Sequence, residues 1–151
     1  MTLNSNQFAQ VPVKGQIDMS IKDGKIGGMI SANQATSLYP GQRVKLDTAA
    51  QVFTPSFVAA AVGDVAIGII AYNTKQSAFA ALEAVEIILF GGPVYYAEAA
   101  AAITAGALVE GVAGAKVQTH SAQQQTGIAL DGASAAGDLI RVICTEPVIV
   151  A

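Results

Sequence analysis

The C-terminal two-thirds of the chain contains one pattern of glycines and aliphatic residues twice. Each copy begins with a glycine turn and a strand. A loop then leads to a short strand that contains a Gly-Ile step, and a second loop leads to a long apolar strand. The matching segments are residues 40–47 with 105–112, 67–71 with 126–130, and 84–89 with 138–143. Because neither copy contains a set of catalytic residues, the repeat predicts a β scaffold that works through its surface.

The composition predicts extensive contact with other protein. The chain has 151 residues, which favours one domain with a substantial core. Hydrophobic residues make up 52% and charged residues only 13% of the sequence, whereas about 25% charged residues is typical of globular domains. This excess of apolar over charged residues predicts self-association, and we expect a homotrimer.

Membranes and nucleic acids are not expected partners. The longest apolar run, residues 57–72, is interrupted by Gly63 and Asp64, and a membrane-spanning helix needs about 20 uninterrupted apolar residues. The N-terminus has neither the basic start nor the apolar stretch of a signal peptide. The lysines and arginines are scattered and the net charge is −3, unlike the clustered basic charge of nucleic-acid-binding proteins.

The sequence predicts two units, an N-terminal arm and hairpin at residues 1–36 and a β domain at residues 37–151. The first unit is polar, and residues 17–21 alternate in hydrophobicity before the hairpin turn at Asp23 and Gly24. Two interpretations stay open: an arm that contacts a partner, or a hairpin that closes the protein's own barrel. The candidate partner-binding residues of the arm are Phe8, Val11, Pro12, Val13 and Ile17.

We expect an all-β fold for the second unit, as a small β-barrel or β-sandwich. The alanine-rich stretch at about residues 98–103 predicts one short helix. Residues 91–93, Gly-Gly-Pro, predict a bulge or corner within the barrel. The predicted core consists of Ile67, Ile69, Val85, Ile87, Leu89, Ile128, Leu130, Ile140 and Val142.

No motif indicates catalysis, a cofactor or a metal. The sequence contains no nucleotide-binding glycine pattern, zinc motif or nucleophile elbow. The lone Cys144 lies in an apolar strand, where a thiol packs as a small hydrophobic group, and the single His120 has no other metal ligand nearby in sequence. We therefore expect no enzyme activity. A hydrolase whose acids are gathered by the fold, such as Asp64 with Glu110, remains an alternative.

The repeated pattern resembles the capsid cement or decoration proteins of tailed bacteriophages. The resemblance rests on residues 40–46, 67–70, 85–91, 103–109, and 127–130 leading to 139–142. It implies a small β-barrel or β-sandwich, usually a trimer, at the local threefold axes of the mature head. It also implies the major capsid protein as partner, no enzyme activity or cofactor, synthesis in the host cytoplasm and a place on the exterior of the virion capsid.

A second function class is a non-catalytic carbohydrate- or peptide-binding β module of a phage tail or fibre. Such a module requires an outward platform of aromatic side chains. Strand alternation places only one of the neighbouring Tyr95 and Tyr96 rings outward. The candidate platform residues are Phe53, Phe57, Tyr72, Tyr95 and Tyr96.

Overall fold

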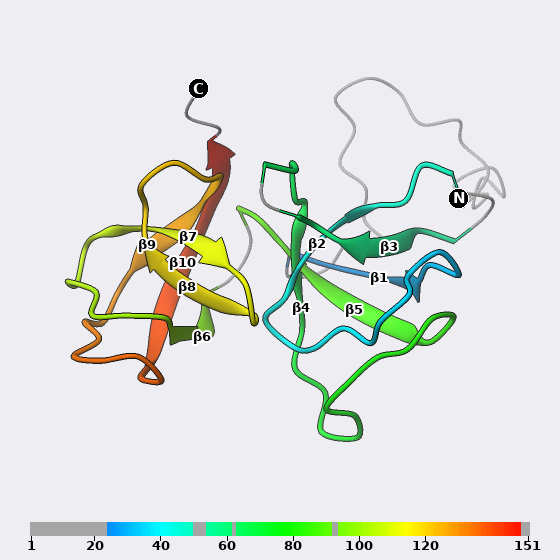
Figure 1. The fold of residues 1–151 in the computed structure, drawn as a ribbon, viewed down its shortest axis with the longest axis horizontal. Helices are drawn as coiled ribbons and strands as arrows, with labels where there is room; N and C mark the ends of the chain where they lie inside the picture. Colours follow the sequence, from blue (N-terminus) through cyan, green and yellow to red (C-terminus); the bar gives the residue numbers. More distant parts are fainter. Residues whose placement is uncertain (1–23, 50–53, 62, 92–93, 149–151) are drawn as a thin grey trace, which may run out of the picture.

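The chain forms two closed β-barrels of five strands each (Figure 1). The computed structural model describes residues 24–49, 54–61, 63–91 and 94–148. Within these ranges the regular elements are ten strands and no helix, which confirms the predicted all-β barrel fold. The same ranges accordingly contain no helix long and apolar enough to cross a membrane.

The first barrel has the strand order β1-β3-β2-β4-β5, and β5 closes it against β1. Strands β1 and β3 run parallel, and the other neighbours are antiparallel. Since five residues of β1 pair with β5, the first barrel includes part of the chain before residue 37. Its strands are β1 (Lys25–Ile30), β2 (Arg43–Leu46), β3 (Ser56–Ala59), β4 (Gly68–Ile70) and β5 (Ala84–Leu89).

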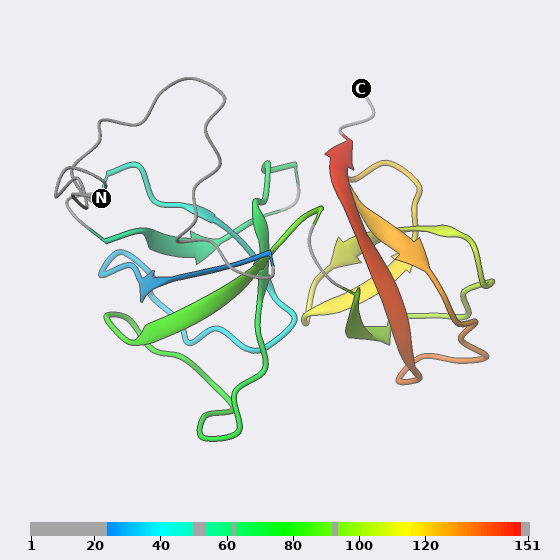
Figure 2. The ribbon, with the colours of Figure 1, turned by 180° about the vertical axis from the view of Figure 1, so that it is seen from behind.

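The second barrel repeats this topology strand for strand. Its order is β6-β8-β7-β9-β10, again with one parallel pair, β6 with β8. The two barrels lie side by side in both ribbon views (Figures 1 and 2). Its strands are β6 (Val94–Ala99), β7 (Leu108–Val112), β8 (Lys116–Thr119), β9 (Gln125–Ala129) and β10 (Leu139–Val148).

Strand register confirms two of the three predicted sequence matches. Val44 lies opposite Gly68 in the first barrel, and Val109 lies opposite Gly127 in the second. The third match was wrong by one residue. The sequence match makes Ile87 of the first barrel equivalent to Arg141 of the second, whereas the strand register makes it equivalent to Val142. A slip of one residue reverses the two faces of a strand.

The glycines of the repeated Gly-Ile step are explained by close backbone packing. A Cβ atom at Gly68 would lie 2.1 Å from the carbonyl oxygen of Ile88. At Gly127 it would lie 2.5 Å from the carbonyl oxygen of Ile143. Each barrel therefore requires a residue without a side chain at this position, where β4 pairs with β5 and where β9 pairs with β10.

Each barrel has its own hydrophobic core. Phe57 and Phe79 are fully buried in the first, whereas the second is filled by smaller aliphatic groups around Tyr95. Of the predicted core, five side chains are buried and three are partly buried, but Leu130 is 41% exposed because β9 ends at the inward Ala129. The buried five are Ile69, Val85, Ile87, Ile140 and Val142; the partly buried three are Ile67, Leu89 and Ile128.

The predicted helix at about residues 98–103 is absent. Strand β6 continues to Ala99, whose N–H donates to the carbonyl of Asp138. The N–H of Ala100 donates to Val117, and that of Ile103 to Ala133. Since these backbone donors bond across the barrel, long-range pairing overrides the helix propensity of the alanines.

The predicted corner at residues 91–93 belongs to the connection between the barrels, because β5 is the last strand of the first and β6 the first strand of the second. Residues 92 and 93 themselves lie outside the described ranges. So do residues 1–23, including the candidate partner-binding Phe8, Val11, Pro12, Val13 and Ile17.

Candidate binding groove between the two barrels

The two barrels are joined by specific polar and apolar contacts. The Gln124 side chain accepts from the Ala66 N–H at 2.8 Å and donates to the Ala66 carbonyl at 2.9 Å. Ile69 of β4 packs into the core cluster of the second barrel, whereas its neighbour Ile70 packs into that of the first. The barrels thus meet through a buried contact that fixes their mutual placement.

Arg43 adds a buried cation to this contact. Its side chain covers Gly111 of the second barrel, where a Cβ atom would lie 2.4 Å from Arg43 Cδ. Burial lowers the pKa of Arg43, and the negative charges of Glu110 and Asp64 oppose that effect. Glu110 and Asp64 therefore help to keep a guanidinium group charged at the junction.

Glu110 has a structural role. Its buried carboxylate accepts hydrogen bonds from the N–H groups of Ser121, Ala122 and Gln123 and from the side chain of Gln118. Burial alone would raise its pKa, but these hydrogen bonds outweigh burial and lower the pKa to about 2. In its ionised form, Glu110 therefore stabilises the loop after β8.

Asp64, the other acid of the hydrolase alternative, is engaged elsewhere. Its carboxylate lies 2.8 Å from Lys45 Nζ and accepts from the Ala61 N–H. The described residues include no group of three or more His, Cys, Asp or Glu placed to hold a metal ion. His120 contacts the Gln123 carbonyl through Nε2, and Cys144 is buried. These side chains have structural partners and form no recognisable catalytic set.

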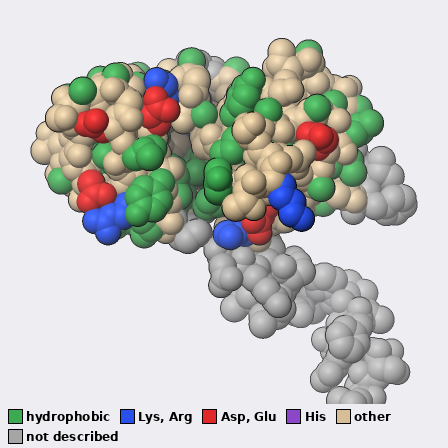
Figure 3. Space-filling model, turned by 90° about the horizontal axis from the view of Figure 1, so that it is seen from below, with side chains coloured by type: hydrophobic (Ala, Val, Ile, Leu, Met, Phe, Trp, Pro, Cys, Tyr) green, Lys and Arg blue, Asp and Glu red, His purple; other side chains and the backbone are tan. Residues whose placement is uncertain are grey.

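A groove of about 750 Å³ lies between the barrels and is lined by both. Seen from below, the molecular surface is hollowed at the junction, with hydrophobic side chains on both sides (Figure 3). All four tyrosines of the chain line this groove: Tyr39, Tyr72, Tyr95 and Tyr96. We call it the tyrosine groove.

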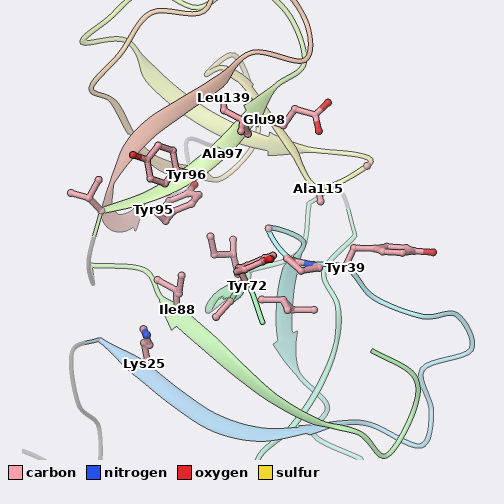
Figure 4. A pocket seen from close by; sticks show the side chains of 17 residues that line it. Lys25, Tyr39, Tyr72, Ile88, Tyr95, Tyr96, Ala97, Glu98, Ala115 and Leu139 are labelled. Carbon is pink, nitrogen blue, oxygen red and sulfur yellow. The ribbon is translucent and has the colours of Figure 1, made fainter. Parts of the chain in front are cut away.

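Three of the four tyrosines are exposed to solvent. Tyr96 of β6 is 72% exposed on the second barrel, whereas Tyr72 and Tyr39 are 77% and 54% exposed on the first (Figure 4). Tyr95 is buried in the core of the second barrel, and burial raises its pKa. The expectation that only one of Tyr95 and Tyr96 points outward is confirmed.

The other lining groups add apolar surface and little net charge. Val94 and Leu139 are exposed aliphatic residues of the second barrel. The charged lining residues are Lys25 and Glu98, and each has a partner: Lys25 lies 3.7 Å from Glu86, and Glu98 lies 2.7 Å from Lys116. The tyrosine groove therefore presents rings, aliphatic groups and hydroxyls.

Sequence reasoning identified part of this groove. Tyr72 and Tyr96 were candidate platform residues and lie in it. Phe57 was also a candidate but fills the first core, and Phe53 lies outside the described residues. Tyr39 was missed, because only the docking of the second barrel places its loop beside residues 94–97.

Comparisons with known proteins show a likeness in fold. No family model matches the chain, and no curated protein matches it in sequence. Among solved structures, the fold is similar to the N base of the head fibre gp8.5 of bacteriophage phi29. The superposition has a TM-score of 0.57 and 8% sequence identity, and covers 84% of this chain and 98% of that structure.

Proposed function

We propose that this protein is a non-catalytic structural component of a tailed-phage head that binds the outside of the shell and clamps neighbouring major capsid proteins. The observation that carries the proposal is the likeness of both barrels together to nearly the whole N base of a head fibre. The family resemblance of the repeated pattern in the sequence points to the same place on the virion.

The architecture suits a clamp. Closed barrels have no free sheet edges, so they tolerate crowding on a shell without strand-to-strand aggregation. Their described surface also carries large apolar side chains that a shell partner can cover. The most exposed aliphatic ones outside the tyrosine groove are Leu82, Val65, Leu108, Leu46 and Leu130.

Assembly strengthens attachment in this proposal. A homotrimer would present three copies of each contact, and linked contacts raise the effective concentration of every further one. The N-terminal segment would add Phe8, Val11, Pro12, Val13 and Ile17 as contacts with neighbouring protein.

The test is co-sedimentation of the purified full chain with phage heads that lack it, together with light scattering of the free protein. We expect saturable binding and the mass of a trimer. A Phe8→Asp/Val11→Asp/Ile17→Asp variant should remain folded but bind heads more weakly, whereas Lys75→Ala, on an exposed turn, should bind as the natural protein does. Failure to bind heads contradicts the function, and unchanged binding of the triple variant contradicts the role of the arm.

A further inference from the structure

We propose that the tyrosine groove is a binding site for a neutral oligosaccharide, an extended chain of uncharged pyranose rings. The starting observation is that the sequence has no tryptophan and only four tyrosines, and that all four line one groove. Because three of them are exposed by more than half, core packing does not account for their position.

Tyrosine supplies the two kinds of contact that a sugar ring requires. Its ring is a flat apolar face, and its hydroxyl group is a hydrogen-bond donor and acceptor. A pyranose has an apolar C–H face and a rim of hydroxyls, so it stacks on the first and bonds to the second. Tyr96 and Tyr72 stand on opposite walls of the groove (Figure 4), which allows successive sugar units to stack on different barrels.

The charge of the groove favours an uncharged ligand. Its two charged lining residues are neutralised by partners, Lys25 by Glu86 and Glu98 by Lys116. Among the described lining residues there is accordingly no unpaired cation to select a phosphate or uronic acid, and no unpaired carboxylate to select a basic peptide. Neutral hydroxyl-bearing rings fit this surface best.

The shape of the groove admits an extended chain but does not suit an added β-strand. Its volume of about 750 Å³ is within the usual range of ligand sites, and it is open to solvent (Figure 3). In the described part of the molecule both sheets are closed, so a peptide has no sheet edge to extend there. Since hydrogen bonds between Gln124 and Ala66 fix the two barrels, the walls are preorganised for binding.

The experiment uses the full chain with three neutral probes: cellohexaose, maltohexaose and hexa-N-acetylchitohexaose. Binding is measured by calorimetry and mapped by chemical-shift changes in NMR spectra. We expect at least one hexasaccharide to bind and to shift residues at Tyr39, Tyr72 and Tyr96. Tyr72→Ala and Tyr96→Ala should each weaken binding about tenfold, as for a central aromatic contact, whereas Tyr96→Phe keeps the stacking ring and most of the affinity.

Leu82→Ala is the matched control, because Leu82 is 66% exposed and lies outside the groove lining. The proposal is overturned if none of the three hexasaccharides binds, or if the Tyr72→Ala/Tyr96→Ala double variant binds as tightly as the natural protein. It is also overturned if a peptide of residues 7–17 shifts the groove tyrosines while the sugars do not, since the groove would then hold a chain segment. Head co-sedimentation of the tyrosine variants is measured separately, so that loss of sugar binding and loss of head attachment are distinguished.

Discussion

Gln124 of the second barrel bonds both polar groups of the Ala66 backbone in the first barrel, at 2.8 and 2.9 Å. The side-chain amide thus takes the place of a neighbouring strand at a position where Ala66 is fully buried. Gln124 thus helps to join two barrels that each close on themselves, and it directly follows Gln123, whose N–H donates to Glu110. The geometry of the tyrosine groove depends on this junction.

Replacing Gln124 by Ala should weaken the junction. The variant leaves the N–H and carbonyl of Ala66 buried without their partner, which costs about 1 to 3 kcal/mol for each group. We therefore expect urea unfolding to show a loss of about 2 to 6 kcal/mol. Gln76→Ala, at the isolated bridge between Asn73 and Gln76 away from the junction, is the control and should change little. Equal stability of the two variants would show that water replaces the Gln124 contacts.

The paired glycines of β4 and β9 should be equally intolerant of a side chain. Gly68→Ala and Gly127→Ala each place a methyl group within 2.5 Å of a backbone oxygen, so we expect each to lose about 1 to 3 kcal/mol by overpacking. Gly27→Ala is the control, because its new methyl group has no atom within 4 Å. Thermal unfolding measures all three, and tolerance of Gly68→Ala would mean that β4 and β5 separate more easily than β9 and β10.

A reciprocal exchange tests the equivalence of Leu82 and Gly137. Both have positive φ, 67° and 93°, and their N–H groups donate to the equivalent carbonyls of Ile30 and Ala99. A side chain in this conformation costs about 1 to 2 kcal/mol, partly offset by the greater entropy of glycine in the unfolded chain.

Leu82→Gly should therefore be neutral or stabilising by up to about 1 kcal/mol, and Gly137→Leu destabilising by about 1 to 2 kcal/mol. Denaturant titration gives both values. A marked loss of stability in Leu82→Gly would contradict this account, because it would mean that the exposed leucine makes a contact worth more than its backbone strain.

The sequence allowed the repeat to be predicted because two glycines in each copy are required by geometry. Gly41 and Gly106 adopt positive φ of 84° and 83°, and Gly68 and Gly127 sit under a backbone oxygen. The matching of β1 with β6 and of β3 with β8 was not predictable, because these strands share topology without sharing residue pattern. The number of barrels was missed for the same reason, since closure depends on the long-range pairing of β1 with β5.

The groove was only partly predictable. Alternation placed only one of Tyr95 and Tyr96 outward, and nothing local indicates that residues 39, 72 and 96 share one surface. They meet because Gln124 and Ile69 dock one barrel on the other, a relationship that no sequence period expresses. The absent helix has the same origin, since the alanines after β6 bond across the barrel.

Glu110 should make stability depend on pH in the acidic range. Its pKa is about 2 in the folded protein, below the ordinary value of 4.5. Between these values the unfolded chain binds a proton that the folded chain does not, so folding stability is full above about pH 4.5 and falls as the pH falls toward 2. Hydrogen bonds from Arg141 and Ser134 also lower the pKa values of Asp131 and Asp138, so the informative quantity is the difference between the natural protein and Glu110→Gln.

At neutral pH, Glu110→Gln should lose about 2 to 4 kcal/mol, because an amide cannot accept all the N–H groups that converge on the carboxylate. The stability difference between the natural protein and the variant should then shrink as the pH falls from 4.5 to 2, since protonation removes the same carboxylate. Glu98→Gln is the control: it removes an exposed ion pair with Lys116 and should cost less than about 1 kcal/mol. Urea unfolding at a series of pH values measures all three proteins. A Glu110→Gln difference that stays constant from neutral pH to pH 2 would show that Glu110 stabilises the loop by shape and not by charge.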